Sequence, residues 1–235
     1  MLALENINVS IQSVPILRDL SLSIGGGELV GLVGRNGAGK TTTLRTIVGL
    51  MKPTQGTVIL DGTDITSLDA HKRPALGIGY MPEDRRLVPQ LTAQENIMLP
   101  AWVNNDIDVK TSMELVFDLI PELTELANRK AMLLSGGQQK LVALGRALMA
   151  GSKILLLDEP FEGVAPVLVQ RLMEVIAALR RENLSILIAQ SELMHSVSLL
   201  DREYVIERGA IISDGSGASR GERVQAGQSS RQVTP

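Results

Sequence analysis

The sequence predicts an α/β protein built around a parallel sheet that is covered on both faces. Continuous apolar runs at residues 154–157 and 186–189, the second within an expected strand from 184 to 189, are typical of buried parallel strands. Between these runs, five apolar residues recur at helical spacing: Leu168, Leu172, Val175, Ile176 and Leu179. With 235 residues, of which 44% are hydrophobic, the chain suffices for one large domain or two small ones. Strand and helix therefore alternate as in a layered α/β domain.

The N-terminal part predicts an antiparallel sheet that leads into a buried strand. Short β-type runs at residues 7–11 and 20–24 are separated by turn residues, and three glycines at 25–27 precede the apolar run 29–33. Residues 40–50 have helical spacing, so the expected order here is strand, glycine-rich turn, helix. Further strands are expected at residues 56–61 and 77–81.

Residues 91–150 predict a helical insert within a single domain that spans residues 1–213. Apolar residues from Met113 to Ile120 share one helix face before Pro121 ends the run. Ser135 has the position of an N-cap for a second helix, which ends near Gly151. Residues 214–235 are mostly small or polar and lack periodicity, which predicts a disordered tail.

The composition excludes several classes of protein. The chain has no cysteine, which rules out disulfide scaffolds, thiol catalysis and cysteine-ligated metal sites. Its formal net charge of -3 lacks the basic excess of a nucleic-acid binder, so no nucleic-acid partner is expected. No apolar run approaches the roughly 18 to 20 residues that span a bilayer, and the N-terminus lacks the pattern of a signal peptide. These features favour a cytoplasmic location.

A glycine-rich motif predicts a phosphate-binding loop, which we call the cradle. Residues 34–41, GRNGAGKT, match G-x-x-x-x-G-K-[ST]. Glycines in such a loop allow successive N–H groups to point at phosphate oxygens, with a helix N-terminus behind them. Lys40 is expected on the β- and γ-phosphates, and the Thr41 hydroxyl in a magnesium shell. The expected nucleotide-binding residues are Gly34, Arg35, Asn36, Gly37, Ala38, Gly39, Lys40, Thr41 and Thr42.

A carboxylate pair, Asp158 and Glu159, ends the apolar strand that begins near residue 153. An aspartate at this position can hold magnesium, and the adjacent glutamate can act as general base on the attacking water. Such a pair can also be an ordinary solvated loop entry. Because a cradle is present in the same predicted sheet, we favour the functional interpretation.

A third motif, Ser135, Gly136, Gly137 and Gln138, predicts a second anion site. A hydroxyl and two small residues at a helix N-terminus leave room for close approach of a phosphate. The same residues can also be a plain N-cap with a glycine turn. Two phosphate sites in one chain favour a dimer that holds nucleotide between the cradle of one subunit and this turn of the other.

Together these motifs resemble the ATP-binding subunit of ABC transporters, over nearly the whole chain to about residue 215. The resemblance rests on the cradle, the helical insert, the LSGGQ run at 134–138 and the ILLLDEP run at 154–160. It implies a P-loop NTPase core with an N-terminal antiparallel β subdomain and an inserted α-helical subdomain. It also implies ATP and Mg²⁺ as cofactors and ATP hydrolysis coupled to transport. Residues 79–86, 91–96 and 163–166 are most similar to the LivF group, which serves importers of branched-chain amino acids and related amide or urea solutes.

Two positions depart from the family pattern. Glu83 stands where the family has a glutamine that contacts magnesium or the attacking water, so the resemblance implies a catalytic and metal-binding role for Glu83, unless it is a bystander. Gln190 replaces a histidine, and glutamine can donate a hydrogen bond to a γ-phosphate but carries no charge. We therefore expect Glu159 to be the general base and Gln190 to contribute less to catalysis.

Aromatic residues form only 2% of the chain. The family stacks adenine on an aromatic side chain near the end of the first strand, but residues 9–14 contain none. Ile11 or Val14 is expected to cover the base instead. Because base-aromatic stacking contributes roughly 1 to 3 kcal/mol, this substitution predicts weak discrimination between ATP and GTP.

The resemblance finally implies partners: membrane permease subunits, a second ATP-binding subunit in a homo- or heterodimer, and indirectly a solute-binding protein. The chain would then lie peripherally on the inner face of the cell membrane. A docking groove for a permease helix is expected between the Glu83 loop and the helical insert, where Leu87, Val88, Pro89 and Leu91 lie, with local burial as the alternative. The rival hypothesis is a cytoplasmic nucleotide-dependent switch or scaffold of ABC type with little turnover.

Overall fold

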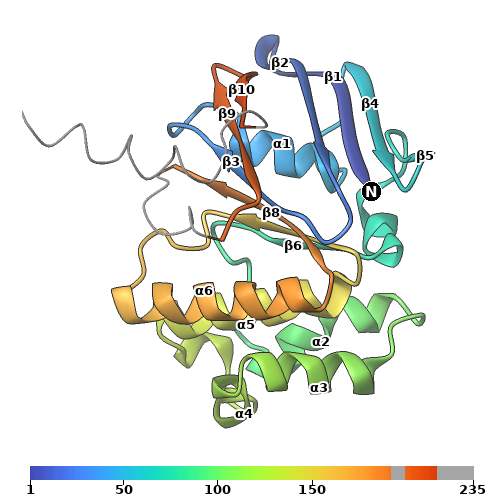
Figure 1. Cartoon of the computed structure of the whole chain (residues 1–235). Coiled ribbons are helices and arrows are strands. Elements are labelled where there is room, and N and C mark those ends of the chain that lie inside the picture. Colours follow the sequence, from blue (N-terminus) through green and yellow to red (C-terminus); the bar gives the residue numbers. More distant parts are fainter. Residues whose placement is uncertain (192–198, 216–235) are drawn as a thin grey trace, which may run out of the picture.

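Two sheets and a layer of helices make up the computed structural model, which describes residues 1–191 and 199–215 (Figure 1). An antiparallel sheet with the order β2-β1-β4-β5 consists of β1 (Leu2–Ile11), β2 (Val14–Ile24), β4 (Gln55–Leu60) and β5 (Thr63–Asp64). A second sheet has the order β10-β9-β3-β8-β7-β6. Its strands are β3 (Leu29–Val33), β6 (Ile78–Met81), β7 (Ile154–Asp158), β8 (Ser185–Gln190), β9 (Arg202–Glu207) and β10 (Ala210–Asp214).

The helices divide between the two faces of the six-stranded sheet. Helix α1 (Lys40–Ile47) lies between the two sheets, and the other α-helices lie together on the opposite side (Figure 1). These are α2 (Ala93–Val103), α3 (Val109–Leu119), α4 (Glu122–Leu126), α5 (Gly136–Ala150) and α6 (Pro166–Arg181). Two short 3₁₀ helices are η1 (Ala70–Leu76) and η2 (Ala131–Leu133). Within the described ranges, no helix is long and apolar enough to cross a membrane.

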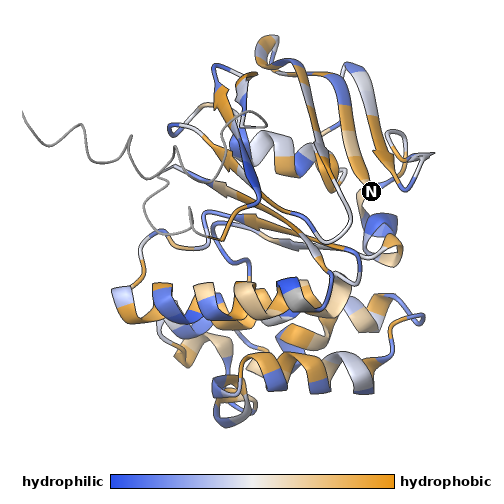
Figure 2. Cartoon of the chain, viewed as in Figure 1, coloured by the Kyte–Doolittle hydropathy of each residue, from blue (hydrophilic) through white to orange (hydrophobic). Residues whose placement is uncertain are grey.

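The central strands are apolar throughout because both of their faces are buried. Along β7, Ile154 and Leu156 pack in the core shared with α1 and the antiparallel sheet, whereas Leu155 and Leu157 pack against the helical layer. Successive side chains of a strand point to opposite faces, so a continuous apolar run is required here. Figure 2 shows hydrophobic colours along much of the central strands, whereas hydrophobic and hydrophilic colours alternate along the helices. The α/β fold class is confirmed.

The parallel register brings three loops to one edge of the sheet. Strands β3, β8 and β7 are neighbours, with Val33 opposite Gln190 and Asp158 opposite Ala189. All three strands therefore end at the same edge, where ligands of open α/β sheets bind. The cradle follows β3, and Glu159 follows β7.

The first strand is longer than its sequence pattern predicts. The pattern indicates a strand from residue 7, but β1 begins at Leu2. Residues Leu2, Leu4, Ile7 and Val9 are buried, and the pairing with β2 shifts register between Leu4 and Ile7, where Asn6 has φ 50°. This β-bulge breaks the period of two, which conceals the first half of the strand.

The C-terminal boundary also differs slightly from expectation. Strand β10 extends to Asp214, so the first residue of the expected tail is part of the sheet. Residues 216–235, for which we predict disorder, lie outside the described residues.

A buried arginine fixes the end of α1, the helix that begins in the cradle. Arg73 in η1 is 2% exposed, and its guanidinium donates to the carbonyls of Thr46 and Ile47 at 3.0 and 2.6 Å. A cation at a helix C-terminus satisfies carbonyls that have no partner within the helix and complements the helix dipole. Arg73 thereby ties the C-terminal end of α1 to η1.

Candidate functional site

The cradle has a backbone that requires glycine at several positions. Gly37 and Gly39 have φ of 82° and 116°, and Gly39 is the N-cap of α1. A Cβ on Gly34 would lie 2.3 Å from the Ile206 carbonyl oxygen. Because the free N–H groups of this helix start favour an anion, the loop has the geometry expected of a phosphate site. Arg35, Asn36 and Gly37 are exposed, and Ala38 is buried.

Lys40 places a buried positive charge at this edge. Its ammonium donates to the Gly34 carbonyl at 2.6 Å and lies 3.3 Å from the Arg35 carbonyl. It also forms a salt bridge with Glu159 Oε1 at 3.1 Å. The first residue of α1 and the residue after β7, which are 119 positions apart, thus meet at the edge of the sheet.

Thr41 and Asp158 form a hydrogen-bonded pair of oxygen-bearing side chains. Thr41 Oγ1 donates to Asp158 Oδ1 at 3.0 Å, and the Tyr80 hydroxyl donates to Asp158 Oδ2 at 3.1 Å. Burial raises the pKa of Asp158 to about 6, although both hydrogen bonds act in the opposite direction. A hydroxyl and a carboxylate suit Mg²⁺, which takes only one or two protein ligands when phosphates supply the rest. No cluster of three or more acidic or histidine side chains with metal-binding geometry occurs within the described residues.

Glu159 is held in an unusual backbone conformation directly after β7. Its φ is 47°, and its N–H donates to the Ala189 carbonyl at 2.9 Å. Left-handed non-glycine residues cost energy and cluster at functional sites. Its carboxylate is 8% exposed and faces Lys40. The two residues of the predicted pair therefore take separate places, Asp158 beside Thr41 and Glu159 beside Lys40.

Glu83 and Gln190 lie at the margins of this group. Glu83 is exposed and lies two residues beyond the end of β6. The burial of Asp158 is the main cause of its raised pKa, and the negative charge of Glu83 raises it further. Gln190 is buried at the end of β8, where its main-chain carbonyl accepts from the Gly34 N–H at 3.3 Å. The next residue, Ser191, brings a hydroxyl to both Lys40 and the Glu159 carboxylate. Sequence reasoning does not single out Ser191, because a serine after a strand has no distinguishing pattern.

The Ser135 turn has the local geometry that its sequence predicts. Ser135 caps α5 by accepting from the Gln138 N–H at 3.3 Å, and the Gln138 side chain accepts from the Ser135 N–H at 3.0 Å. This reciprocal pair is a capping box. Arg85 donates to the Gly136 carbonyl at 3.1 Å. Ser135 and Gly136 are exposed, so this helix start is open to a ligand or a partner.

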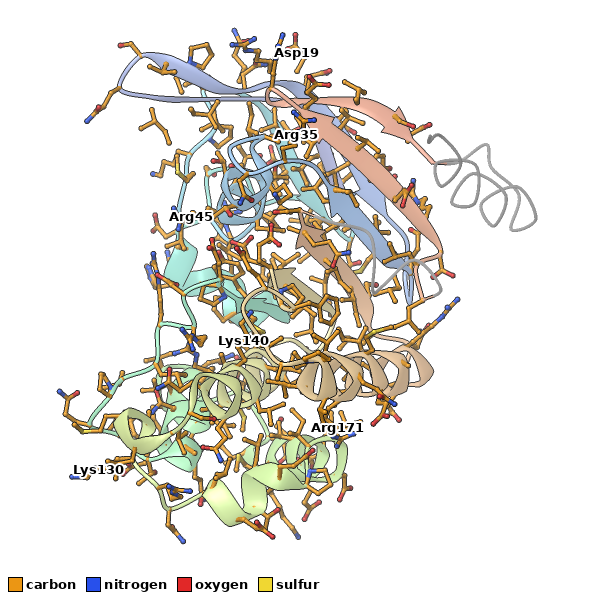
Figure 3. All side chains as sticks on the ribbon, turned by 90° about the vertical axis from the view of Figure 1, so that its left-hand side faces the viewer. Asp19, Arg35, Arg45, Lys130, Lys140 and Arg171 are labelled. Carbon is orange, nitrogen blue, oxygen red and sulfur yellow. The ribbon has the colours of Figure 1, made fainter. Side chains whose placement is uncertain are left out.

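A buried lysine connects the Ser135 helix to the loop that follows β7. Lys140 is 4% exposed, and its ammonium donates to the carbonyls of Glu159, Pro160 and Glu162 at 2.8, 3.1 and 2.6 Å. In Figure 3, Lys140 lies between α5 and the strands above it. Burial lowers the pKa of Lys140, with a further contribution from Arg85. A lysine within a helix is normally expected to be exposed to solvent, so the sequence gives no sign of this contact.

The two residues that are expected to cover the adenine base lie at an exposed hairpin. Ile11 and Val14 flank the turn between β1 and β2 and are 43% and 57% exposed. A cavity of about 510 Å³ lies beside the cradle, but it is lined by residues 34–38, by residues 205–208 at the end of β9, and by Ile212. Ile11 is not part of its wall. Any contact of Ile11 with a base is thus with an open surface.

The loop after Glu83 is tied to α5. Arg146 donates to the carbonyls of Arg85 and Arg86, both of which have positive φ. Leu87 packs against the core of the helical layer, whereas Val88 is exposed. Arg146 also lines a hollow of about 240 Å³, together with Val48, Leu50, Pro100 and Val103 among others.

Comparison with known proteins identifies the family. The family model described as ABC transporter matches residues 17–162. A lipopolysaccharide export ATP-binding protein, LptB of Haemophilus influenzae, is 37% identical over 92% of this chain and 90% of its own length. A high-affinity branched-chain amino acid transport ATP-binding protein, BraG of Pseudomonas aeruginosa, is 35% identical over 93% of this chain and 94% of its own length.

Solved structures agree with this result. A nucleotide-free ATP-binding cassette from an ABC transporter superposes with a TM-score of 0.82 at 29% identity, covering 96% of this chain and 95% of the cassette. A cassette in its ADP conformation gives a TM-score of 0.81 at 28% identity, covering 97% and 96%. A dimeric bacterial cassette gives 0.81 at 26% identity, covering 91% and 97%. Because the family model spans more than half of the chain and the relatives match nearly all of it, this chain belongs to the ABC transporter family as an ATP-binding subunit with ATPase function.

Proposed function

We propose that this chain hydrolyses ATP with Glu159 as general base. The observation that supports this is the meeting of Lys40 and Thr41 from the cradle with Glu159 and Asp158 from β7. The Lys40 charge would stabilise negative charge on the β- and γ-phosphate oxygens, and the Glu159 carboxylate would accept the proton of the attacking water. Thr41 and Asp158 would hold Mg²⁺, which neutralises developing phosphate charge when bound. Glu83 would contact the magnesium or the attacking water, and Gln190 would donate a hydrogen bond to the γ-phosphate.

A steady-state assay tests this proposal. The purified chain is expected to release phosphate from ATP in the presence of Mg²⁺, and EDTA should stop turnover. Lys40→Met should remove activity because the phosphate charge loses its counterion. Metal-independent turnover would contradict the role of Thr41 and Asp158. An inert but nucleotide-binding chain, alone and with permease membranes, would favour the rival hypothesis of a switch with little turnover.

We also propose that the working form is a dimer, homo- or heteromeric, in which the Ser135 turn of one subunit completes the cradle of the other. The exposed helix start at Ser135 and Gly136 supports this, since its hydrogen bonds are made within its own helix and to Arg85. The relative solved as a dimeric cassette supports it further.

We propose that closure of the dimer on ATP drives a conformational change in a membrane permease. The apolar hollow beside Arg146 suits a partner helix, because Leu50 and Val103 are 53% and 82% exposed at its rim. Support for a site near the predicted groove comes from Pro100 and Val103 of α2, which line this hollow, and from Arg146, which joins it to the loop after Glu83. Leu87 in that loop is partly buried against the core. The chain would then be a peripheral subunit on the inner face of the membrane.

We propose import of branched-chain amino acids or related amides as the transport reaction, with a solute-binding protein as an indirect partner. The loop motifs of the LivF type and the similarity to BraG support this proposal. Export of lipopolysaccharide is a second candidate, because LptB is similar to the same degree. Uptake of labelled leucine in a strain that lacks this gene separates the two. Reduced uptake supports import, whereas unchanged uptake of leucine and of amides with a defective outer membrane supports export.

A further inference from the structure

Ser191 holds both carboxylate oxygens of Glu159. The Ser191 N–H donates to Glu159 Oε2 at 3.1 Å, and its hydroxyl lies 2.6 Å from Glu159 Oε1. The two residues belong to neighbouring strand ends, since Glu159 follows β7 and Ser191 follows β8. A carboxylate bound at both oxygens has one orientation instead of several, which removes the rotational freedom of its terminal torsion.

The same hydroxyl connects Glu159 to the cradle. Ser191 Oγ lies 3.2 Å from Lys40 Nζ and 2.6 Å from Asn36 Oδ1. A hydroxyl donates one hydrogen bond and accepts two, so it accepts from Lys40 and shares its single proton between the amide and carboxylate oxygens. One small side chain therefore touches three residues of the proposed site, which come from the loops after β3 and β7.

We propose that Ser191 is a positioning residue of the hydrolytic site, which fixes the Glu159 carboxylate relative to Lys40 and Asn36. This inference rests on the proposed role of Glu159 as general base. Glu159 has a left-handed backbone and a side chain that reaches the site from the edge of β7, so a second strand end is needed to define where its oxygens lie. General-base catalysis depends on that placement, because misplacement by about 1 Å is costly even without loss of a catalytic group.

A second serine on the same strand provides a matched control. Ser185 begins β8, and its hydroxyl accepts from the Gly27 N–H at 3.0 Å and donates to the Gly25 carbonyl at 2.9 Å. It thus holds fixed loop residues by one accepted and one donated hydrogen bond, at the end of the strand that lies away from the cradle. Loss of this hydroxyl tests what loss of fixed loop contacts alone does to activity.

The experiment compares steady-state ATP hydrolysis of Ser191→Ala, Ser191→Thr and Ser185→Ala. Ser191→Ala is expected to lower kcat about tenfold with little change in KM for MgATP, because Glu159 acts on the water and not on the nucleotide. Ser191→Thr keeps the hydroxyl and should restore most of kcat. Ser185→Ala should lower the melting temperature while kcat stays as in the unmodified chain. A rise in KM at constant kcat for Ser191→Ala, or no rescue by threonine, would overturn the proposal.

A double-variant cycle separates this inference from the proposed function. If Ser191 acts through Glu159, Ser191→Ala should have no further effect on the residual turnover of Glu159→Gln. An equal tenfold loss in both backgrounds would show that Ser191 acts elsewhere and would leave Glu159 as the base. Full turnover of Glu159→Gln would overturn the assignment of the base and the positioning role together.

Discussion

The edge of the parallel sheet and the Ser135 turn are both anion sites by sequence, but the fold builds them in opposite ways. At the sheet edge, Lys40, Asp158 and Glu159 are buried, and Lys40 meets Glu159 while Thr41 meets Asp158 across long separations in sequence. At the turn, Ser135 is exposed and its own contacts are with the first turn of α5. The first site is organised within one chain, whereas the second is an open half-site. The difference agrees with the proposal that the cradle binds nucleotide within one chain and that a second chain completes the site for hydrolysis.

The largest expected effect concerns the sheet edge. Glu159→Gln keeps the shape of the side chain but removes the base, so kcat should fall by about 10² to 10⁴ while ATP binding persists. Gln190→Ala should weaken hydrolysis less, because an uncharged amide can lose only a hydrogen bond. Phosphate release and nucleotide titration measure the two effects. Wild-type turnover in Glu159→Gln would contradict the role of this residue.

A subunit-mixing experiment tests whether the Ser135 turn is a half-site. Lys40→Met and Ser135→Arg should each abolish turnover, the first at the cradle and the second by filling the anion site. A mixture of the two proteins should regain activity, because the cradle of the Ser135→Arg chain and the turn of the Lys40→Met chain form one intact pair. Recovery should approach a quarter of the wild-type rate per chain. If the mixture stays inactive while both variants dimerise with ATP, each chain works alone.

The connection between the two regions is expected to contribute to stability as well as activity. Lys140→Met leaves three carbonyls without their donor, and those of Glu159 and Pro160 belong to buried residues. An unsatisfied buried group costs about 1 to 3 kcal/mol. We expect a loss of this size in the free energy of unfolding, measured with urea, and a lower kcat. Lys130→Met, at an exposed position, is the control and should change stability little. Unchanged stability of the Lys140 variant would show that the loop after Glu159 does not depend on this contact.

The buried charge at the sheet edge should also give a pH signature. Burial raises the pKa of Asp158 to about 6, against about 4 in an unfolded chain. The folded state binds this proton more tightly, so the stability due to Asp158 is fully present below about pH 4 and is lost as the pH rises through about 6. In EDTA, Asp158→Asn should therefore gain stability relative to the unmodified chain between pH 4 and 7. A difference that is constant with pH would contradict this.

The smallest expected effect concerns recognition of the adenine base. Because Ile11 is an aliphatic residue at an exposed hairpin, ATP and GTP should compete within about tenfold in a binding titration, since stacking contributes roughly 1 to 3 kcal/mol. Ile11→Tyr should sharpen the preference for adenine. A hundredfold preference of the unmodified chain for ATP would show that the base is recognised by other residues.

Local chemistry made a large part of this protein predictable from its sequence. The cradle, the Ser135 cap and the carboxylate pair depend on glycine torsions, capping hydrogen bonds and strand periodicity, all of which act over a few residues. The strand β1 was incompletely predicted for the same reason, because one bulged residue, Asn6, displaced its period.

The tertiary structure alone decided which distant residues meet. Ser191 reaches Asn36 across 155 positions, Lys140 reaches the loop after β7 across about 20, and Arg73 reaches the end of α1 across 26 or 27. Each of these side chains has a partner set by the parallel strand order and by helix packing, and spacing along the chain carries no information about such partners. The sequence therefore determined the separate parts of the site, and the sheet register determined how they are joined.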